Sequence, residues 1–200
     1  RHQSIAFERS VVSPGGCGSN VAIGLGALGV PTALVACMGA DVPARLLDQY
    51  WQRWGIECQD VRQVEGQSTG VSVGLVDRES QPRFIHTPGA NRLLTAEDLN
   101  VDAYVAAGAK FLHIAGYFVL PGILDERLGA ALQRARARGL VTSLDVVQSP
   151  RMNQPEILWT CLPHLDYFLC NQREAATITG MADFKAAAVS LRQRGAQTVI

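Results

Sequence analysis

Residues 111–145 read FLHIAGYFVLPGILDERLGAALQRARARGLVTSLD, and this stretch decides the fold class. It opens with an apolar, strand-like run at 111–115, and a helical pattern follows at 123–138 until Gly139 ends it. A second strand-like run occupies 141–145. Strands that alternate with helices in this way predict a parallel sheet covered by helices on both faces.

The same alternation runs along most of the chain. Further helices are expected at 20–28, 43–54, 154–161, 171–178 and 183–194, and further strands at 32–37, 167–170 and 197–200. The sequence therefore predicts an α/β fold with a Rossmann-like, mostly parallel sheet.

One region breaks this alternation. Residues 69–76 and 83–87 have the period-two character of an antiparallel hairpin, and residues 5–12 also read as a strand. We predict that these segments form a small β lid that stands off the main sheet. The predicted division of the chain is a lid of residues 1–14 and 67–87 and an α/β core of residues 15–66 and 88–200.

Composition limits the classes of function. The chain has 200 residues, 48% of them hydrophobic, which is enough for one substantial core. Its 18 basic and 18 acidic residues balance, so no nucleic-acid partner is expected, and no apolar run approaches the roughly 18 residues of a membrane span. An odd number of cysteines without a C-x-x-C pair indicates reduced thiols in the cytoplasm and no structural zinc; they are Cys17, Cys37, Cys58, Cys161 and Cys170.

A glycine-rich turn, Gly15-Gly16-Cys17-Gly18-Ser19-Asn20, opens the first predicted helix. Glycines let a backbone approach a ligand closely, and a helix N-terminus offers unpaired N–H groups, so the turn suits an oxygen-rich ligand. A tight turn without any ligand is the alternative. Asn20 can cap the helix, or it can offer a donor and acceptors to sugar hydroxyls.

The stretch Gly24-Leu25-Gly26-Ala27-Leu28-Gly29 matches the dinucleotide fingerprint literally. It lies inside and at the end of a predicted helix, whereas the fingerprint belongs between a strand and a helix. We interpret these glycines as close helix packing and a C-terminal stop. A nicotinamide-dependent dehydrogenase stays an alternative that rests on them alone, and no Walker lysine motif supports a P-loop.

Polar residues follow several predicted strands, at the sheet edge where ligands bind in open α/β folds. Asp41 and Asp145 are candidates by position, although Asp41 can equally cap the next helix. Asn171 and Glu174 fit a capping box, or a carboxylate that helps to hold hydrated Mg²⁺ near phosphate. His113 is interpreted as a buried strand residue and not as a ligand.

These pieces occur in a recognisable order. Gly15-Gly16-x-Gly-x-Asn20-Val-Ala is followed by Gly39-x-Asp41, the predicted hairpin, Pro88-Gly89-Ala90-Asn91 and Asn171-x-x-Glu174. In this order they resemble the ribokinase-like (PfkB) carbohydrate kinases over essentially the whole chain. The resemblance implies a three-layer α/β/α sandwich with a small β lid, and transfer of the γ-phosphoryl group of ATP to a primary hydroxyl of a sugar or nucleoside.

The resemblance also implies roles for individual residues. Substrate binding would fall to Gly15, Gly16, Asn20 and Asp41, and support of phosphate and magnesium, without direct metal ligation, to Asn171 and Glu174. The implied cofactors are ATP and Mg²⁺, with a monovalent cation such as K⁺ as a further candidate. A homodimer through exposed lid strands is the candidate assembly.

The sequence also departs from the family pattern. The catalytic Gly-Ala-Gly-Asp turn does not occur in these 200 residues, so the family's catalytic base is expected beyond Ile200 and no catalytic residue is assigned in this chain. The strand that carries a substrate-binding aspartate is expected upstream of Arg1. Ala44 stands where the family often has glycine, and Val119 stands about where ribokinase has a substrate-binding glutamate. We therefore expect an incomplete chain, inactive alone and of open substrate identity. A non-catalytic, sugar- or nucleoside-binding pseudokinase is the alternative.

Overall fold

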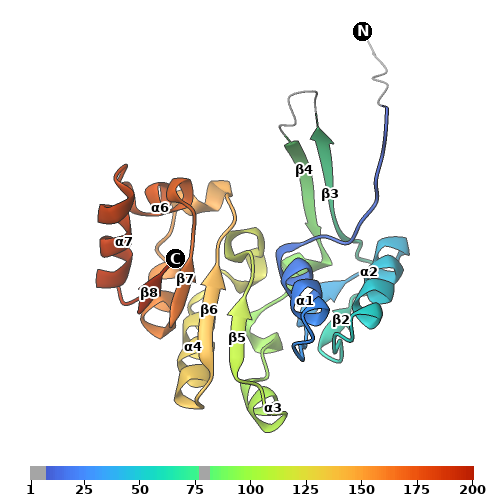
Figure 1. Ribbon diagram of the computed structural model, residues 1–200, viewed down its shortest axis with the longest axis horizontal. Helices are drawn as coiled ribbons and strands as arrows, with labels where there is room; N and C mark the ends of the chain where they lie inside the picture. Colours follow the sequence, from blue (N-terminus) through green and yellow to red (C-terminus); the bar gives the residue numbers. More distant parts are fainter. Residues whose placement is uncertain (1–7, 77–81) are drawn as a thin grey trace.

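The fold is described from a computed structural model, which covers residues 8–76 and 82–200 (Figure 1). Its largest part is a four-stranded sheet in the order β5-β6-β7-β8, and every neighbouring pair is parallel. The strands are β5 (Phe111–Ile114), β6 (Val141–Asp145), β7 (Tyr167–Leu169) and β8 (Thr198–Val199). The parallel sheet predicted from the alternating pattern is confirmed.

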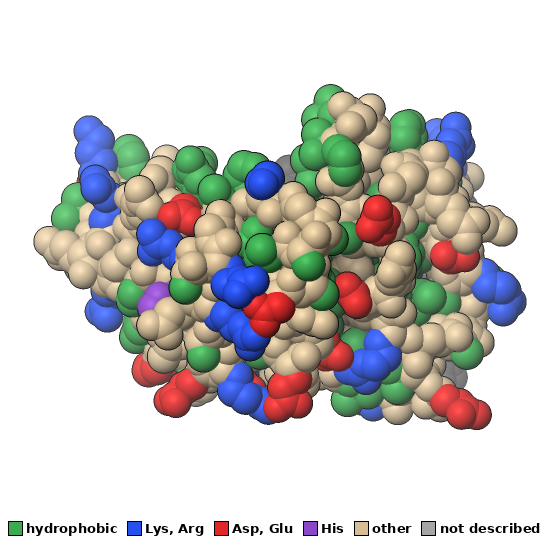
Figure 2. All heavy atoms as spheres, turned by 90° about the horizontal axis from the view of Figure 1, so that it is seen from below, with side chains coloured by type: hydrophobic (Ala, Val, Ile, Leu, Met, Phe, Trp, Pro, Cys, Tyr) green, Lys and Arg blue, Asp and Glu red, His purple; other side chains and the backbone are tan. Residues whose placement is uncertain are grey.

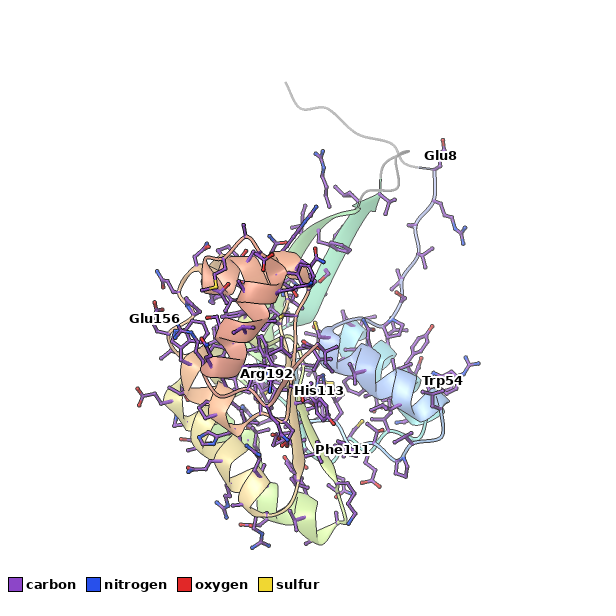
Figure 3. The ribbon with its side chains drawn as sticks, turned by 60° about the vertical axis from the view of Figure 1, so that its left-hand side comes forward. Glu8, Trp54, Phe111, His113, Glu156 and Arg192 are labelled. Carbon is purple, nitrogen blue, oxygen red and sulfur yellow. The ribbon has the colours of Figure 1, made fainter. Side chains whose placement is uncertain are left out.

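Alternate residues of this sheet face one hydrophobic core. Leu112, Ile114, Leu144 and Phe168 are buried there, because side chains along a strand point to opposite faces in turn. The helices that contribute to this core are α3 (Val101–Ala106), α4 (Glu126–Ala137), α5 (Leu158–Cys161), α6 (Gln172–Thr179) and α7 (Phe184–Gln193). In Figure 3 the sheet separates these helices from α1 (Cys17–Ala27) and α2 (Val42–Arg53). The fold is therefore the predicted three-layer α/β type.

A second, two-stranded parallel sheet joins β1 (Ala36–Met38) to β2 (Val61–Gln63), beside α1 and α2. The two helices pack closely, since a Cβ at Gly26 would lie 2.5 Å from the carbonyl oxygen of Trp54. Trp51 Nε1 also donates a hydrogen bond to Ser19 Oγ at 2.8 Å. The interpretation as close helix packing is confirmed at Gly26 but not at Gly24, where a Cβ would meet no atom within 4 Å, and Gly29 follows the helix at a positive φ of 74°.

The antiparallel hairpin consists of β3 (Thr69–Val76) and β4 (Pro82–Gly89), as predicted. It projects away from both sheets (Figure 1). The strand predicted at 5–12 is wrong over residues 8–12, which pair with no described strand; residues 5–7 lie outside the described residues. Val11 and Val12 are 71% and 80% exposed, so burial does not hold this segment in a sheet.

Other boundaries differ from the prediction. The helix expected at 154–161 is reduced to α5, and α1 begins three residues before Asn20. The prediction missed β2 and α3, which are short. It also missed six 3₁₀ turns, at Ala90–Leu93, Ala96–Asp98, Tyr117–Val119, Pro121–Ile123, Pro150–Asn153 and Leu162–His164.

The strand predicted at 197–200 is shorter than expected. It is reduced to β8, and Ile200 follows it with a side chain that is 63% exposed. The backbone of Ile200 still pairs with the neighbouring segment, because its N–H donates to the Phe168 carbonyl and its carbonyl accepts the Cys170 N–H, both at 2.9 Å. The backbone hydrogen bonds between the two segments therefore extend one residue past the strand.

The surface mixes both signs of charge. Figure 2 shows basic and acidic side chains next to one another, and Arg134 and Arg138 both pair with Asp102. No helix in residues 8–76 and 82–200 is long and apolar enough to cross a membrane. All five cysteines are free thiols.

Candidate functional site

The glycine turn leads directly into α1. Gly16 is the N-cap, with a positive φ of 92° that a residue with a side chain rarely adopts, and the helix begins at Cys17. Asn20 donates its backbone N–H to the Gly16 carbonyl at 2.9 Å, so Asn20 lies in the first turn of the helix and does not cap it. Gly15, Gly16 and Asn20 are exposed, which leaves their predicted substrate contacts sterically open.

The N-terminus of α1 lies against the carboxyl end of β5. A Cβ at Gly116, two residues past β5, would lie 2.8 Å from Cys17 Sγ and 3.1 Å from Cys17 Cβ. Gly116 also has a positive φ of 70°, so this position favours glycine both for its backbone conformation and for its lack of a side chain. This close approach, which was not predicted from the sequence, places the glycine turn at the edge of the main sheet where ligands bind in α/β folds.

Asp145 ends β6 at the same edge and is linked to β5. One carboxylate oxygen accepts the backbone N–H of Gly116, and the other lies 3.4 Å from His113 Nε2. His113 Nδ1 lies 2.9 Å from Ser143 Oγ, its register partner on β6. The sequence singled out Asp145 as a candidate but interpreted His113 as a buried strand residue, and the strand register brings the two together with Ser143. His113 is half-buried, not fully buried as predicted.

Asn171 and Glu174 form the predicted capping box at the start of α6. Asn171 Oδ1 accepts the Glu174 N–H at 2.9 Å, and Glu174 Oε2 accepts the Asn171 N–H at 2.8 Å. Only 8% of Glu174 is exposed. Its Oε1 makes no hydrogen bond within the described residues, so one carboxylate oxygen stays available to a ligand.

Burial and nearby carboxylates raise the pKa values of two cysteine thiols at this edge, Cys17 and Cys170. Burial raises the pKa of the Cys17 thiol, and the negative charges of Asp145 and Glu174 raise that pKa further. Burial and Glu174 raise the pKa of Cys170 to about 11. Both thiols are therefore protonated at neutral pH, which argues against a nucleophilic role because the thiolate is the reactive form. The ends of β5 and β6 and the start of α1 thus meet at one polar edge, through Gly116, Asp145 and Cys17.

Asp41 lies elsewhere, at the N-terminus of α2, where it is the N-cap that the sequence allowed. Its Oδ1 accepts the Ala44 N–H at 3.0 Å, and its two oxygens also accept hydrogen bonds from Thr69, the first residue of the hairpin. Partial burial raises the pKa of the Asp41 carboxyl, but the hydrogen bonds from Thr69 and Ala44 outweigh it and hold this pKa below its usual value. No hydrogen bond or ion pair within the described part of the chain joins Asp41 to Asp145.

The sequence assigned no catalytic residue to this chain and expected the family's base beyond Ile200. Ile200 has an apolar side chain that cannot take up a proton, so it has no catalytic role itself. It is only the residue beyond which the base is expected. It lies one residue past β8, at the carboxyl edge of the same sheet as Asp145. The place of the base beyond Ile200 stays a prediction.

A cavity of about 230 Å³ opens just beyond Gly116 in the chain. Its lining is mainly apolar, with two polar residues, and consists of Tyr117, Phe118, Leu124, Arg151, Gln154, Ile157 and Leu158. The Tyr117 hydroxyl is buried without a hydrogen-bond partner in the described residues, and burial raises its pKa. No pattern in the sequence indicated this cavity.

The polar edge of the sheet has the chemistry for a polyhydroxyl ligand beside a hydrated cation. Backbone N–H groups of the glycine turn can donate to oxygen atoms, and Asp145 and Glu174 can accept from hydroxyls or water. Residues 8–76 and 82–200 contain no cluster of three His, Cys, Asp or Glu side chains that could hold a metal directly.

Comparison with known proteins gives a consistent result. The sequence model described as "pfkB family carbohydrate kinase" matches residues 2–200. A deoxyribokinase from Salmonella typhi is 26% identical over 192 residues, which are 93% of this chain and 60% of that protein. The chain thus spans less than two thirds of this relative.

Solved structures establish the fold. Adenosine kinase from Sinorhizobium meliloti aligns with a TM-score of 0.81 and 22% identity, over 94% of this chain and 58% of that one. An E. coli protein described as a ribokinase II, solved with ATP and Mg²⁺, aligns with a TM-score of 0.75 and 19% identity, over 98% of this chain and 65% of that one. At such identities the likeness shows a ribokinase-like fold.

Proposed function

This chain belongs to the PfkB family of carbohydrate kinases, and from that premise we propose that the protein it comes from transfers the γ-phosphoryl group of ATP to a primary hydroxyl of a sugar or nucleoside. The observation that carries the proposal is the close packing of Cys17, the first residue of α1, against Gly116. It sets the exposed Gly15-Gly16 turn close to Asp145, whose carboxylate accepts the Gly116 N–H, at the carboxyl edge of a parallel sheet. Donors and acceptors meet there as a sugar requires.

In this proposal the substrate side of the site comes from α1. The N–H groups of the turn and the Asn20 amide bind and orient sugar hydroxyls, while Asp145 is held in place by the Gly116 N–H and by His113. Asp41 stays a proposed substrate contact on the strength of the resemblance alone. Orientation matters because phosphoryl transfer is catalysed almost entirely by positioning and electrostatic stabilisation.

The residues at the start of α6 fit a supporting role for Mg²⁺ and phosphate. Glu174 Oε1 is free of protein hydrogen bonds in the described residues and can accept from metal-bound water, while Asn171 and the helix N-terminus offer donors near phosphate. When bound, Mg²⁺ and ATP would supply charge neutralisation and the phosphoryl group. A K⁺ requirement stays a prediction.

The hairpin β3–β4 is the proposed lid. Closure over the sugar would exclude water, which could otherwise accept the phosphoryl group. Val71, Val73 and Ile85 share one face of the hairpin, 41%, 49% and 68% exposed, which supports the proposed homodimer through the lid.

The 200 residues alone are expected to bind without turnover, because they contain no Gly-Ala-Gly-Asp turn to stabilise a transferring phosphate. A non-catalytic pseudokinase that binds a sugar or nucleoside is the second candidate. We expect the protein to act in the cytoplasm.

A coupled ADP-release assay tests the proposal. The protein encoded by the whole gene and the 200-residue chain are each given Mg-ATP and a panel of sugars and nucleosides. Turnover of one compound by the former and not by the latter is expected. Binding without turnover by both would replace the kinase with the pseudokinase, and absence of both binding and turnover would remove the proposal.

A further inference from the structure

The base of the hairpin is tied to the core through one carboxylate. Asp41 Oδ2 accepts the backbone N–H of Thr69 at 2.8 Å, and Asp41 Oδ1 accepts the Thr69 hydroxyl at 2.6 Å. Thr69 Oγ1 in turn accepts the N–H of Gly39, the residue that follows β1, at 3.0 Å. Because Oδ1 also caps α2 through Ala44, this clamp joins the end of β1, the start of α2 and the start of β3.

The clamp is buried at Thr69, partly exposed at Asp41, and closely packed. Thr69 is 3% exposed. A Cβ at Gly39 would lie 2.2 Å from the carbonyl oxygen of Gln67, and one at Gly89 would lie 2.4 Å from that of Ser68. Gly89 is the register partner of Thr69, so both strands of the hairpin pass through this junction with backbone in direct contact. The base therefore has little freedom to tilt.

Beyond its base the hairpin has little support. Residues 71–76 and 83–87 are exposed, and Figure 1 shows β3 and β4 extending away from both sheets. The direction of such an arm is set where it is attached. A small change at Thr69 would be magnified along the eight residues of β3, about 26 Å of extended strand.

We propose that Asp41 is a positioning residue that fixes the direction of the lid by clamping Thr69 to the N-terminus of α2. Its second oxygen distinguishes it from an ordinary helix cap, which needs one acceptor only. The lid's place over a substrate rests on the proposed function, whereas the clamp itself is a property of the 200-residue chain. The two can therefore be tested separately.

The first test measures backbone hydrogen exchange on the 200-residue chain. Asp41→Ser keeps a good cap for α2 but is too short to hold both Thr69 donors, and Thr69→Val keeps the shape of the side chain but loses its hydroxyl. In each variant the backbone amides of the hairpin should exchange roughly tenfold faster or more than in the wild-type chain. A hydrogen bond to a charged group changes an equilibrium constant by at least about that factor. The matched control is Asp183→Ser, because Asp183 caps α7 through Ala186 and touches no hairpin residue.

A double variant shows whether the two residues act as one unit. The two variants share the loss of the hydrogen bond from the Thr69 hydroxyl to Asp41, so Asp41→Ser combined with Thr69→Val should speed exchange by less than the product of the two single effects. Additive effects, or hairpin exchange in Asp41→Ser no faster than in Asp183→Ser, would overturn the clamp.

The second test uses the protein encoded by the whole gene, once a substrate has been found. Thr69→Val, which breaks the clamp and leaves Asp41 in place, should raise KM for the sugar or nucleoside several-fold more than Asp183→Ser, and Asp41→Ser should do the same. Equal KM values in Thr69→Val and Asp183→Ser would overturn the positioning role even if the exchange data uphold the clamp. Failure of the wild-type protein to phosphorylate any substrate would count against the proposed function, not against the clamp.

Discussion

Substitution of Gly116 by alanine should separate α1 from the main sheet. Gly116 has a φ of 70°, and the left-handed conformation costs an L-residue roughly 1–2 kcal/mol. Its Cβ would also lie 2.8 Å from Cys17 Sγ, and overpacking of this kind costs about 1–3 kcal/mol. Gly116→Ala should therefore lower the free energy of unfolding by about 2–5 kcal/mol.

A second glycine separates the two costs. Gly139 has a φ of 86°, but a Cβ there would meet no atom within 4 Å, so Gly139→Ala should cost only the backbone part of about 1–2 kcal/mol. Urea unfolding of both variants measures the difference. Cys17→Ala in the Gly116→Ala background should recover part of the loss, since it removes Sγ but leaves Cβ at 3.1 Å.

Equal destabilisation by Gly116→Ala and Gly139→Ala would refute the reasoning. It would mean that Cys17 does not press on Gly116. The glycine turn would then not be held at the edge of the main sheet, and the proposed substrate contacts of the turn and Asn20 would have no structural support.

Three further predictions concern the core, α6 and acid stability. Leu144→Ala removes a fully buried side chain of β6 and should lower the free energy of unfolding by about 2–5 kcal/mol in urea; a loss well below 1 kcal/mol would contradict its place in the core. Glu174→Ala should cost about 0.5–2 kcal/mol and Glu174→Gln much less, because glutamine can complete the capping box. In the protein encoded by the whole gene, Glu174→Gln should nevertheless raise the Mg²⁺ concentration needed for half-maximal turnover, and an unchanged Mg²⁺ dependence would remove Glu174 from the magnesium site. The lowered pKa of Asp41 stabilises the fold above the unfolded value of about 3.9, and this contribution disappears as pH falls through the folded pKa, so Asp41→Asn should flatten that part of the acid unfolding curve; an identical curve would contradict it.

Local patterns predicted the main elements well. The alternation around β5, α4 and β6 is a property of neighbouring residues, so it could be read before any tertiary contact was known. The same holds for the caps at Asp41 and Asn171, whose partners lie three residues away. The strand predicted at 5–12 failed over residues 8–12 because a strand-like segment forms a strand only where it finds a pairing partner.

The predicted site residues lie on different elements, and local patterns could not predict which distant segments each one contacts. Asn20 lies in α1, Glu174 in α6 and Asp41 at the base of the hairpin, and the contacts between segments that give them surroundings were not visible in the sequence.

The sequence by itself determined the α/β class, the hairpin, the glycine turn and the helix caps, because each depends on residues a few positions apart. Only the tertiary structure decided that Cys17 packs on Gly116, that His113 meets Ser143 and Asp145, and that Asp41 holds Thr69 across 28 positions of the chain. These contacts depend on strand register and on the packing of α1 against β5. Both are set by burial of the whole core and not by any local pattern.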